Sequence, residues 1–320
     1  MKANAKISVV MCTYNGARFI REQLDSILRQ SCPVHEIIVQ DDGSTDETQN
    51  ILKEYARKDA RIKVFKNEEK HGVNGNFLSA MKRSEGDFIA TADQDDIWEL
   101  NKIELQMRAI EGKLLCSGLS RPFSTDGSFA FFDHRKRNVN ILRMMFLGLP
   151  GHTLLFRREL LEELPCIDHS IYRYSMYDAV LSIVAAGKES IVFIDKVLVN
   201  FRRHSSATTY TDYSRSLPTW KNAMNNLLWG CKNYRETKQK VSPLFSAKLQ
   251  LMRDIVSHSP DLKEAIKIME LEIAKGWTDF LRLQYHCIKN YQKLFHTNGK
   301  GFIRILRAAL YPIMQLQMYR

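Results

Sequence analysis

The sequence lacks the features that would mark a membrane-spanning or disulfide-stabilised protein. No apolar run approaches the ~18 residues that a membrane-spanning helix needs. The six cysteines are scattered without a C-x-x-C pair, which argues against a zinc site and a disulfide framework. The first residues, MKANAKISVV, show no cleavage pattern of a signal peptide. We therefore expect a globular protein of the reducing cytoplasm.

Two glycine-rich nucleotide motifs are also missing. After the first apolar run comes CTYNGARF, which lacks the G-x-G-x-x-G of dinucleotide-dependent oxidoreductases. A nucleotidyltransferase acting on sugar phosphates would show a glycine-rich, basic loop here, and Gly16 stands alone with Arg18. This enzyme class stays open as an alternative, because it too uses a metal and a nucleotide. Release of pyrophosphate would reveal it.

Acidic residues are scarce in the last third of the chain. Residues 1–214 contain 29 Lys and Arg and 29 Asp and Glu, whereas residues 215–320 contain 18 and 7. The whole net charge of +11 therefore lies after Ser214. This split, together with a change to long helical patterns, predicts an α/β domain at residues 1–214 and a basic, mainly helical extension at residues 215–320.

The basic composition raises a second alternative, a non-catalytic nucleic-acid-binding protein. The sequence pI is about 9.3. However, the basic excess lies outside the α/β region, and stretches such as FIRILRAALYPI mix it with apolar residues. This mixture fits a membrane surface better than a nucleic acid, so we expect no nucleic-acid partner.

Short apolar runs alternate with helical patterns through the first two thirds of the chain. KISVVMC, EIIVQ, RIKVF and DFIATA are typical of buried parallel strands. Between them lie FIREQLDSILRQ, QNILKEYARK and NFLSAMKRS, which have helical spacing. We expect Ser44 or Thr45 to cap the second helix and Asn74 or Asn76 the third. The alternation predicts right-handed βαβ units and a mostly parallel sheet flanked by helices.

Carboxylates crowd at the ends of two predicted strands, where parallel sheets bind ligands. Asp93, Asp95 and Asp96 follow DFIATA, and Asp41 and Asp42 end the stretch EIIVQDD. The first group would suit a divalent cation that also binds phosphate oxygens. The second would accept hydrogen bonds from a nucleobase or ribose. The simpler alternatives are a solvated helix N-terminus and a capped turn, respectively.

Three stretches in series resemble a known family. VVMCTYNGARFIREQLDSILRQ, EIIVQDDGSTDET and ATADQDDIW resemble the nucleotide-binding half of family-2 glycosyltransferases. The resemblance covers residues 6–205 and implies an inverting enzyme with the GT-A fold, a catalytic domain at residues 1–214, and a nucleotide-diphosphate sugar donor. The variant D-Q-D-D-I-W resembles rhamnosyltransferase-like members of bacterial surface polysaccharide synthesis. In these members a Y-R-x-H-like motif closes the region, and here Phe201 replaces its tyrosine and Arg203 holds the middle position.

The resemblance implies a donor site at the first two strand ends. Thr13, Tyr14 and Asn15 would hold the base, largely through backbone groups. Asp41 or Asp42 would bind the base N3–H and the ribose. Uracil, thymine and guanine all offer a ring N–H, so the base stays open.

The resemblance also implies Mg²⁺ or Mn²⁺ as cofactor. Asp95 would coordinate the ion through the diphosphate, and Asp93 would contact the ribose or the ion. His204 would complete the metal site or hold the diphosphate, with Arg202 or Arg203 beside it. A structural role for this histidine is the alternative.

An inverting enzyme needs a base for the acceptor hydroxyl. We assign this role to Asp178 in YSMYDAVLS, with Asp168 in PCIDHS as the rival and an N-terminal helix charge as the simpler interpretation. His152 would line the acceptor pocket, where Gly151 allows close approach of the chain. The expected acceptor is a saccharide or a lipid-linked saccharide.

Residues 280–320 contain seven basic and no acidic residues. Within them Phe302, Ile303, Leu306, Leu310 and Ile313 recur at helical spacing. We expect this segment to lie on the anionic inner face of the plasma membrane; the alternative is a helix that packs this stripe on the catalytic domain. The sequence gives no indication of oligomeric state.

Overall fold

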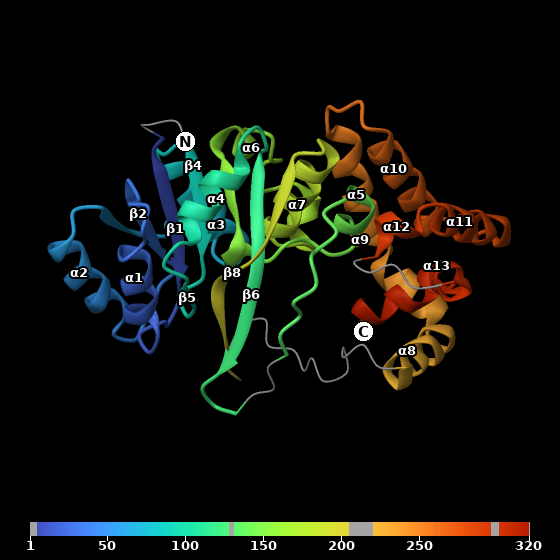
Figure 1. The fold of residues 1–320 in the computed structure, drawn as a ribbon, viewed down its shortest axis with the longest axis horizontal. Helices are drawn as coiled ribbons and strands as arrows, with labels where there is room; N and C mark the ends of the chain where they lie inside the picture. Colours follow the sequence, from blue (N-terminus) through green and yellow to red (C-terminus); the bar gives the residue numbers. More distant parts are fainter. Residues whose placement is uncertain (1–4, 128–130, 205–219, 296–300, 320) are drawn as a thin grey trace.

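The computed structural model describes residues 5–127, 131–204, 220–295 and 301–319 (Figure 1). Its centre is a sheet of eight strands in the order β3-β2-β1-β4-β7-β6-β8-β5. The strands are β1 (Ile7–Thr13), β2 (Glu36–Asp41), β3 (Ile62–Lys66), β4 (Phe88–Ala92), β5 (Ile97–Trp98), β6 (Leu115–Ser124), β7 (Leu155–Arg157) and β8 (Ile191–Arg203).

The first four strands of the order are parallel, as the sequence predicts. β7 is antiparallel to both β4 and β6, β6 and β8 are parallel, and β5 is antiparallel to β8. Thr13 lies opposite Asp41 in the sheet, and Met11 lies opposite Ala92. The carboxyl ends of β1, β2 and β4 therefore meet at one edge, which carries both acidic clusters.

Helices cover both faces of this sheet because its strands are apolar on both sides. The helices of this part are α1 (Ile20–Leu28), α2 (Thr48–Lys58), α3 (Val73–Arg83), α4 (Lys102–Ile110), α5 (Ile141–Met144), α6 (Arg158–Glu162) and α7 (Tyr177–Gly187). Val9 and Met11 of β1 share a buried cluster with α1, whereas Val10 points to the other face and shares a cluster with α3. Strand alternation thus assigns neighbouring residues to opposite helix layers.

The predicted caps of α2 and α3 are wrong. α2 begins at Thr48, whose amide N–H donates to Asp46 (3.0 Å), while Ser44 is drawn into the strand-end network described below. α3 begins at Val73 after Gly72, which has a φ of 92° that favours glycine. Asn74 therefore lies inside the first turn of the helix rather than before it.

The last third of the chain is helical, as predicted. It contains α8 (Trp220–Lys232), α9 (Tyr234–Asp254), α10 (Pro260–Ile273), α11 (Trp277–Lys289), α12 (Tyr291–Leu294) and α13 (Phe302–Met314). None of the described helices is long and apolar enough to cross a membrane.

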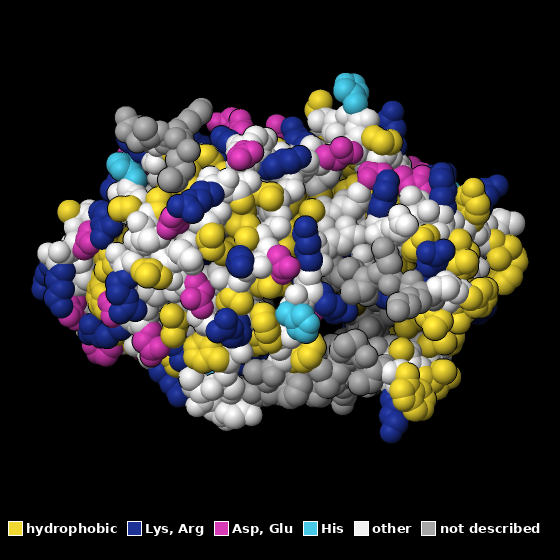
Figure 2. Space-filling view, viewed as in Figure 1, with side chains coloured by type: hydrophobic (Ala, Val, Ile, Leu, Met, Phe, Trp, Pro, Cys, Tyr) yellow, Lys and Arg dark blue, Asp and Glu magenta, His cyan; other side chains and the backbone are white. Residues whose placement is uncertain are grey.

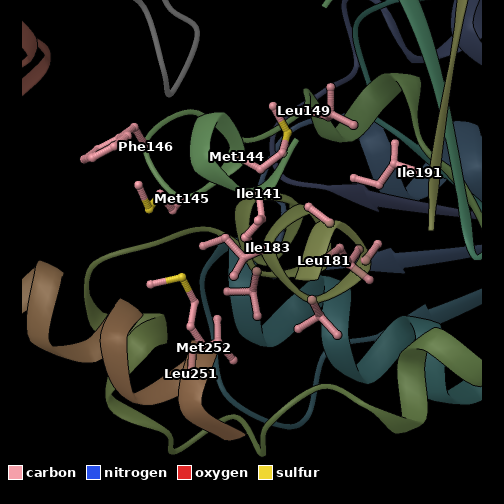
Figure 3. Close-up of a cluster of buried hydrophobic side chains, with 14 of the residues drawn as sticks. Ile141, Met144, Met145, Phe146, Leu149, Leu181, Ile183, Ile191, Leu251 and Met252 are labelled. Carbon is pink, nitrogen blue, oxygen red and sulfur yellow. The ribbon is translucent and has the colours of Figure 1, made fainter. Parts of the chain in front are cut away.

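These C-terminal helices share a hydrophobic core with the α/β part. Figure 3 shows Leu251 and Met252 of α9 in one cluster with Ile183 of α7 and Ile141 of α5. The predicted boundary near Ser214 lies outside the described residues, so the division into residues 1–214 and 215–320 stays a prediction.

Candidate active site

Asp41 is a saturated hydrogen-bond acceptor at the end of β2. Its carboxylate accepts from the hydroxyls of Thr13 (2.9 Å) and Ser44 (2.5 Å), the backbone N–H of Ser44 (2.9 Å) and Gly43 (3.2 Å), and the amide of Gln49 (3.1 Å). The side chain is buried. Asp41 therefore fixes the loop after β2 and has little acceptor capacity left for a ligand.

Asp42 is the more accessible carboxylate of the pair. Its oxygens contact Nδ1 of His71 (2.7 Å), the backbone N–H of Gly72 (2.8 Å) and the amide of Asn67 (2.7 Å). The His71 ring is largely exposed. Asp42 thus joins the end of β2 to the loop before α3, and it lies nearer to solvent than Asp41.

The Thr13-Tyr14-Asn15 loop is fixed by side chains from distant segments. Gln94 accepts from the N–H of Tyr14 (2.9 Å) and donates to the carbonyl of Tyr14 (3.0 Å). The N–H of Asn15, a residue with a φ of 49°, donates to Ser44 (2.8 Å). The backbone donors of Tyr14 and Asn15 are therefore occupied within the protein, and the Tyr14 ring is exposed to solvent.

Asp95 and His204 lie together, although they are far apart in the sequence. His204 Nε2 is 3.0 Å from Asp95 Oδ2, and both side chains are mostly buried. His204 also packs against Phe19, with ring centroids 5.1 Å apart. His204, which follows β8, thus lies beside the aspartates that follow β4.

The Arg202 guanidinium is committed to protein groups. Its Nε donates to the carbonyl of Asp95 (2.7 Å), and its Nη2 pairs with Glu22 (2.8 Å). Phe19 and Phe123 flank it at 4.4 and 4.7 Å. These contacts hold the end of β8 against the loop after β4. Arg203 is buried beside Phe201.

Asp93, Asp96 and His152 form a second cluster. One ligand atom from each lies within 4.8 Å of the others, and among the described residues this is the one His, Cys, Asp or Glu group with metal-site geometry. Nδ1 of His152 is 3.4 Å from Asp93 and 3.7 Å from Asp96. His152, predicted in the acceptor pocket, therefore contacts two carboxylates and stacks on Phe201.

Asp96 has an unusual environment for a carboxyl group. It is fully buried, and among the described groups its Oδ2 has no hydrogen-bond partner. Burial raises the pKa of Asp96 to about 8. Burial alone would lower the pKa of His152, but the charges of Asp96 and Asp93 outweigh it and raise this pKa. The raised pKa values of Asp96 and His152 mean that this cluster favours binding of a proton or another cation.

Asp178 lies in the first turn of α7 and keeps only a minor part of its surface exposed. Its carboxylate accepts from the backbone N–H of Gly151 (3.0 Å) and of Ala179 (2.8 Å). Burial, with a contribution from the charge of Asp93, outweighs these bonds and raises the pKa of Asp178 to about 6. A carboxyl group with this pKa is suited to accept a proton near neutral pH.

A cavity of about 430 Å³ lies between the loop after β3 and the segment before α7. Asn74 joins its two walls by donating to the carbonyls of Tyr172 and Ser175 (3.0 Å each) and accepting from the N–H of Tyr177 (2.8 Å). Asp168 lines the cavity and pairs with Lys70 at 3.4 Å. The rival base therefore lies in an exposed ion pair at the wall of this cavity.

Gly151 permits the close contact between its own segment and α7. A Cβ atom at this position would lie 2.5 Å from the hydroxyl of the buried Tyr177 and 3.5 Å from Cβ of Asp178. We expect Gly151→Ala to lower the free energy of unfolding by ~1–3 kcal/mol, as overpacked sites do. Urea denaturation tests this expectation, with Gly112→Ala as control because nothing lies near a Cβ at Gly112. Equal losses in both variants would contradict it.

Sequence reasoning missed Gln94 and the burial of Asp96. Gln94 stands between two aspartates, and its bond to Tyr14 joins positions 80 residues apart. Asp96 differs from Asp95 only in its fold environment. The one local signal was the apolar pair Ile97 and Trp98, which makes it favourable to bury the residue before them.

Comparison with known proteins identifies the family. The model of glycosyl transferase family 2 matches residues 8–177, more than half of the chain. The putative teichuronic acid biosynthesis glycosyltransferase TuaG of Bacillus subtilis (strain 168) is 39% identical over 101 residues, which are 32% of this chain and 40% of TuaG. A second relative is the UDP-Glc:alpha-D-GlcNAc-diphosphoundecaprenol beta-1,3-glucosyltransferase WfgD of Escherichia coli. It is 39% identical over a stretch that makes up 32% of this chain and 39% of WfgD. An uncharacterized glycosyltransferase of Rickettsia prowazekii (strain Madrid E) is 26% identical over 85% of both chains.

Solved structures confirm the predicted fold. S. aureus TarS 1–349 in complex with UDP has a TM-score of 0.56 at 16% identity, covering 98% of this chain and 91% of TarS. The mannosyltransferase PcManGT of Pyrobaculum calidifontis, in complex with GDP-Man and Mn²⁺, has a TM-score of 0.52 at 17% identity. The match covers 99% of this chain and 87% of PcManGT. The protein therefore belongs to glycosyl transferase family 2 and is a glycosyltransferase with the GT-A fold.

Proposed function

We propose that this enzyme is a metal-dependent, inverting glycosyltransferase of bacterial surface polysaccharide synthesis. It transfers a sugar from a nucleotide-diphosphate sugar to a saccharide or lipid-linked saccharide acceptor in the cytoplasm. The observation that carries the proposal is the carboxyl group of Asp178, which two backbone N–H groups orient and whose pKa burial raises to about 6. The names of WfgD and TuaG, which refer to a diphosphoundecaprenol acceptor and to teichuronic acid, support the choice of acceptor class.

The donor base is assigned to the edge formed by β1 and β2. Asp42 is the acceptor that a base N–H or ribose hydroxyl would reach, because Asp41 is already saturated. The exposed Tyr14 ring offers an apolar face to the base. The structural neighbours carry UDP in one case and GDP-Man in another, so both bases remain candidates.

The metal is assigned to Asp95 and His204, with Asp93 at the adjacent edge. Asp95 and Asp93 keep 20% and 40% of their side-chain surface exposed, as an ion that also binds phosphate requires. Asp96 is fully buried and already accepts from the N–H of Arg202 (2.9 Å), so it suits a proton held with His152 better than a hydrated ion. When bound, Mg²⁺ or Mn²⁺ would neutralise the charge of the departing diphosphate.

The acceptor is assigned to the cavity between the loop after β3 and the segment before α7. Met176 lines this cavity and lies two residues before Asp178 in the chain, so an acceptor bound there is proposed to direct a hydroxyl towards the base. Asp178 would take the proton of that hydroxyl as it attacks the anomeric carbon. Two backbone N–H groups keep the carboxylate oriented for this step.

The pH dependence follows from the pKa of Asp178. The proposed base works only as the carboxylate, so kcat/KM should rise as pH increases through about 6 and level off above it. A pH profile at saturating metal tests this, with donor affinity measured at each pH as control. A flat profile through the region of pH 6 would contradict the assignment.

The donor is identified by its effect on thermal stability. Nucleoside diphosphates and nucleotide sugars are each added with Mn²⁺, with Mg²⁺ and with EDTA, and the unfolding temperature is recorded. A ligand at ~100 times its Kd stabilises the folded state by about 2.7 kcal/mol. We expect one nucleotide series to stabilise the protein only with metal. Stabilisation that is equal in EDTA would contradict metal dependence.

A further inference from the structure

The surface of helices α8, α11 and α13 is unusually apolar. Six large side chains on these helices are between 61% and 73% exposed: Trp220, Leu228, Trp277, Tyr285, Phe302 and Ile303. α13 packs directly against both α8 and α11, so the three helices are neighbours. Figure 2 shows apolar side chains gathered over this end of the molecule. We call these six residues the apolar face.

The apolar face is additional to the residues that attach the helices to the core. α13 buries Ala308, Tyr311 and Pro312, and α11 buries Leu283 and Cys287. The stripe predicted from the sequence of α13 thus points partly outward. Folding of the described core does not require the exposed residues, because other side chains already pack the inner faces of these helices.

The charges on the same helices are almost all positive. α8, α11 and α13 contain six Lys or Arg and one acid: Lys221, Lys232, Arg282, Lys289, Arg304, Arg307 and Asp279. α8 and α13 contain no acidic residue. A second copy of this surface would bring like charges together, whereas anionic lipid headgroups complement them.

We propose that the apolar face and its basic residues dock this enzyme on the surface of an anionic phospholipid membrane. Trp, Tyr and Phe side chains would enter the headgroup layer while Lys and Arg contact lipid phosphates. β6 is parallel to β1 and β4, so its arrowhead in Figure 1 marks the edge that carries the candidate active site. α8 lies towards that same edge, so docking would hold the site near a lipid-linked acceptor. Membrane binding itself does not depend on the proposed donor, metal or base.

Vesicle flotation with the full chain tests the proposal. The wild type should float with vesicles of phosphatidylglycerol and phosphatidylcholine, float less in high salt, and stay at the bottom with phosphatidylcholine alone. The double variant Phe302→Ser, Ile303→Ser should bind vesicles at least ~10-fold more weakly. Each large apolar side chain that leaves water on binding is expected to raise the affinity by about that factor. The control is Val256→Ser, which replaces an apolar residue that is 83% exposed after α9.

Three outcomes would overturn the proposal. The first is a wild type that ignores anionic vesicles at low salt. The second is a double variant that keeps its circular dichroism spectrum and floats as well as the wild type. The third is a wild-type dimer, found by light scattering, that the double variant dissociates while neither protein floats; the apolar face would then be an interface between two copies. Because flotation needs no donor, its failure would leave the proposed function untouched.

Discussion

Asp178→Asn is expected to retain donor affinity and to slow sugar transfer by ~10²–10⁴-fold, the contribution of a positioned general base. The asparagine amide has nearly the same shape, and its single oxygen can still accept from one of the two N–H groups, that of Gly151 or that of Ala179, but it cannot take up a proton. Calorimetric titration with donor and a transfer assay separate the two effects. The change should appear in kcat rather than in donor Kd.

Asp168→Asn tests the rival assignment of the base. Asp168 is an exposed aspartate that pairs with Lys70 at the wall of the proposed acceptor cavity, so its loss should raise the KM for the acceptor and leave kcat near normal. If Asp168→Asn abolishes transfer while Asp178→Asn leaves the rate near normal, the roles of the two aspartates are reversed. If neither variant slows transfer, the base lies elsewhere.

Asp95→Asn is expected to preserve the fold and to remove the divalent-cation dependence of donor binding. Because a metal contact to a diphosphate is worth several kcal/mol, the loss in donor affinity with Mn²⁺ should be on the order of 10²-fold. Calorimetry of the nucleotide with Mn²⁺ and with EDTA measures it. His204→Gln should act in the same direction, since His204 and Asp95 are in contact.

Asp96→Asn distinguishes the two candidate metal groups. Asp96 belongs to the Asp93 and His152 cluster, which also has metal-site geometry. If the ion binds through Asp95, donor binding to a folded Asp96→Asn variant keeps its Mn²⁺ dependence. If Asp96→Asn loses this dependence and Asp95→Asn keeps it, the ion belongs to the second cluster. A thermal melt verifies that each variant is folded.

The sequence predicted the edge of the sheet at which the acidic clusters meet. This was possible because apolar runs and helical spacing determine a parallel βαβ order, and carboxyl ends of parallel strands share an edge. The same reasoning could not place His152 beside Asp96. That contact depends on β7, which pairs antiparallel with β4. This pairing places the turn before β7, which contains His152, at the carboxyl end of β4.

The failed caps have a similar cause. Ser44 is a good cap by local rules, but in the fold its hydroxyl donates to Asp41 and accepts from Asn15. Tertiary hydrogen bonds with buried partners thus outweigh a local preference worth about 1 kcal/mol. For Arg202 the resemblance implied a place beside the diphosphate, which stays a prediction, and the fold adds that Glu22 and Asp95 engage its guanidinium.

The chemistry of donor hydrolysis tests the central claim most directly. The enzyme is incubated with Mn²⁺ and the nucleotide sugar that stabilises it, and water serves as a slow acceptor in place of the saccharide. Proton NMR recorded before mutarotation identifies the first sugar anomer, and phosphorus NMR identifies the leaving group. We predict release of a nucleoside diphosphate and a sugar of inverted anomeric configuration, with no reaction in EDTA. A retained anomer, or release of pyrophosphate in place of the nucleoside diphosphate, would contradict the account.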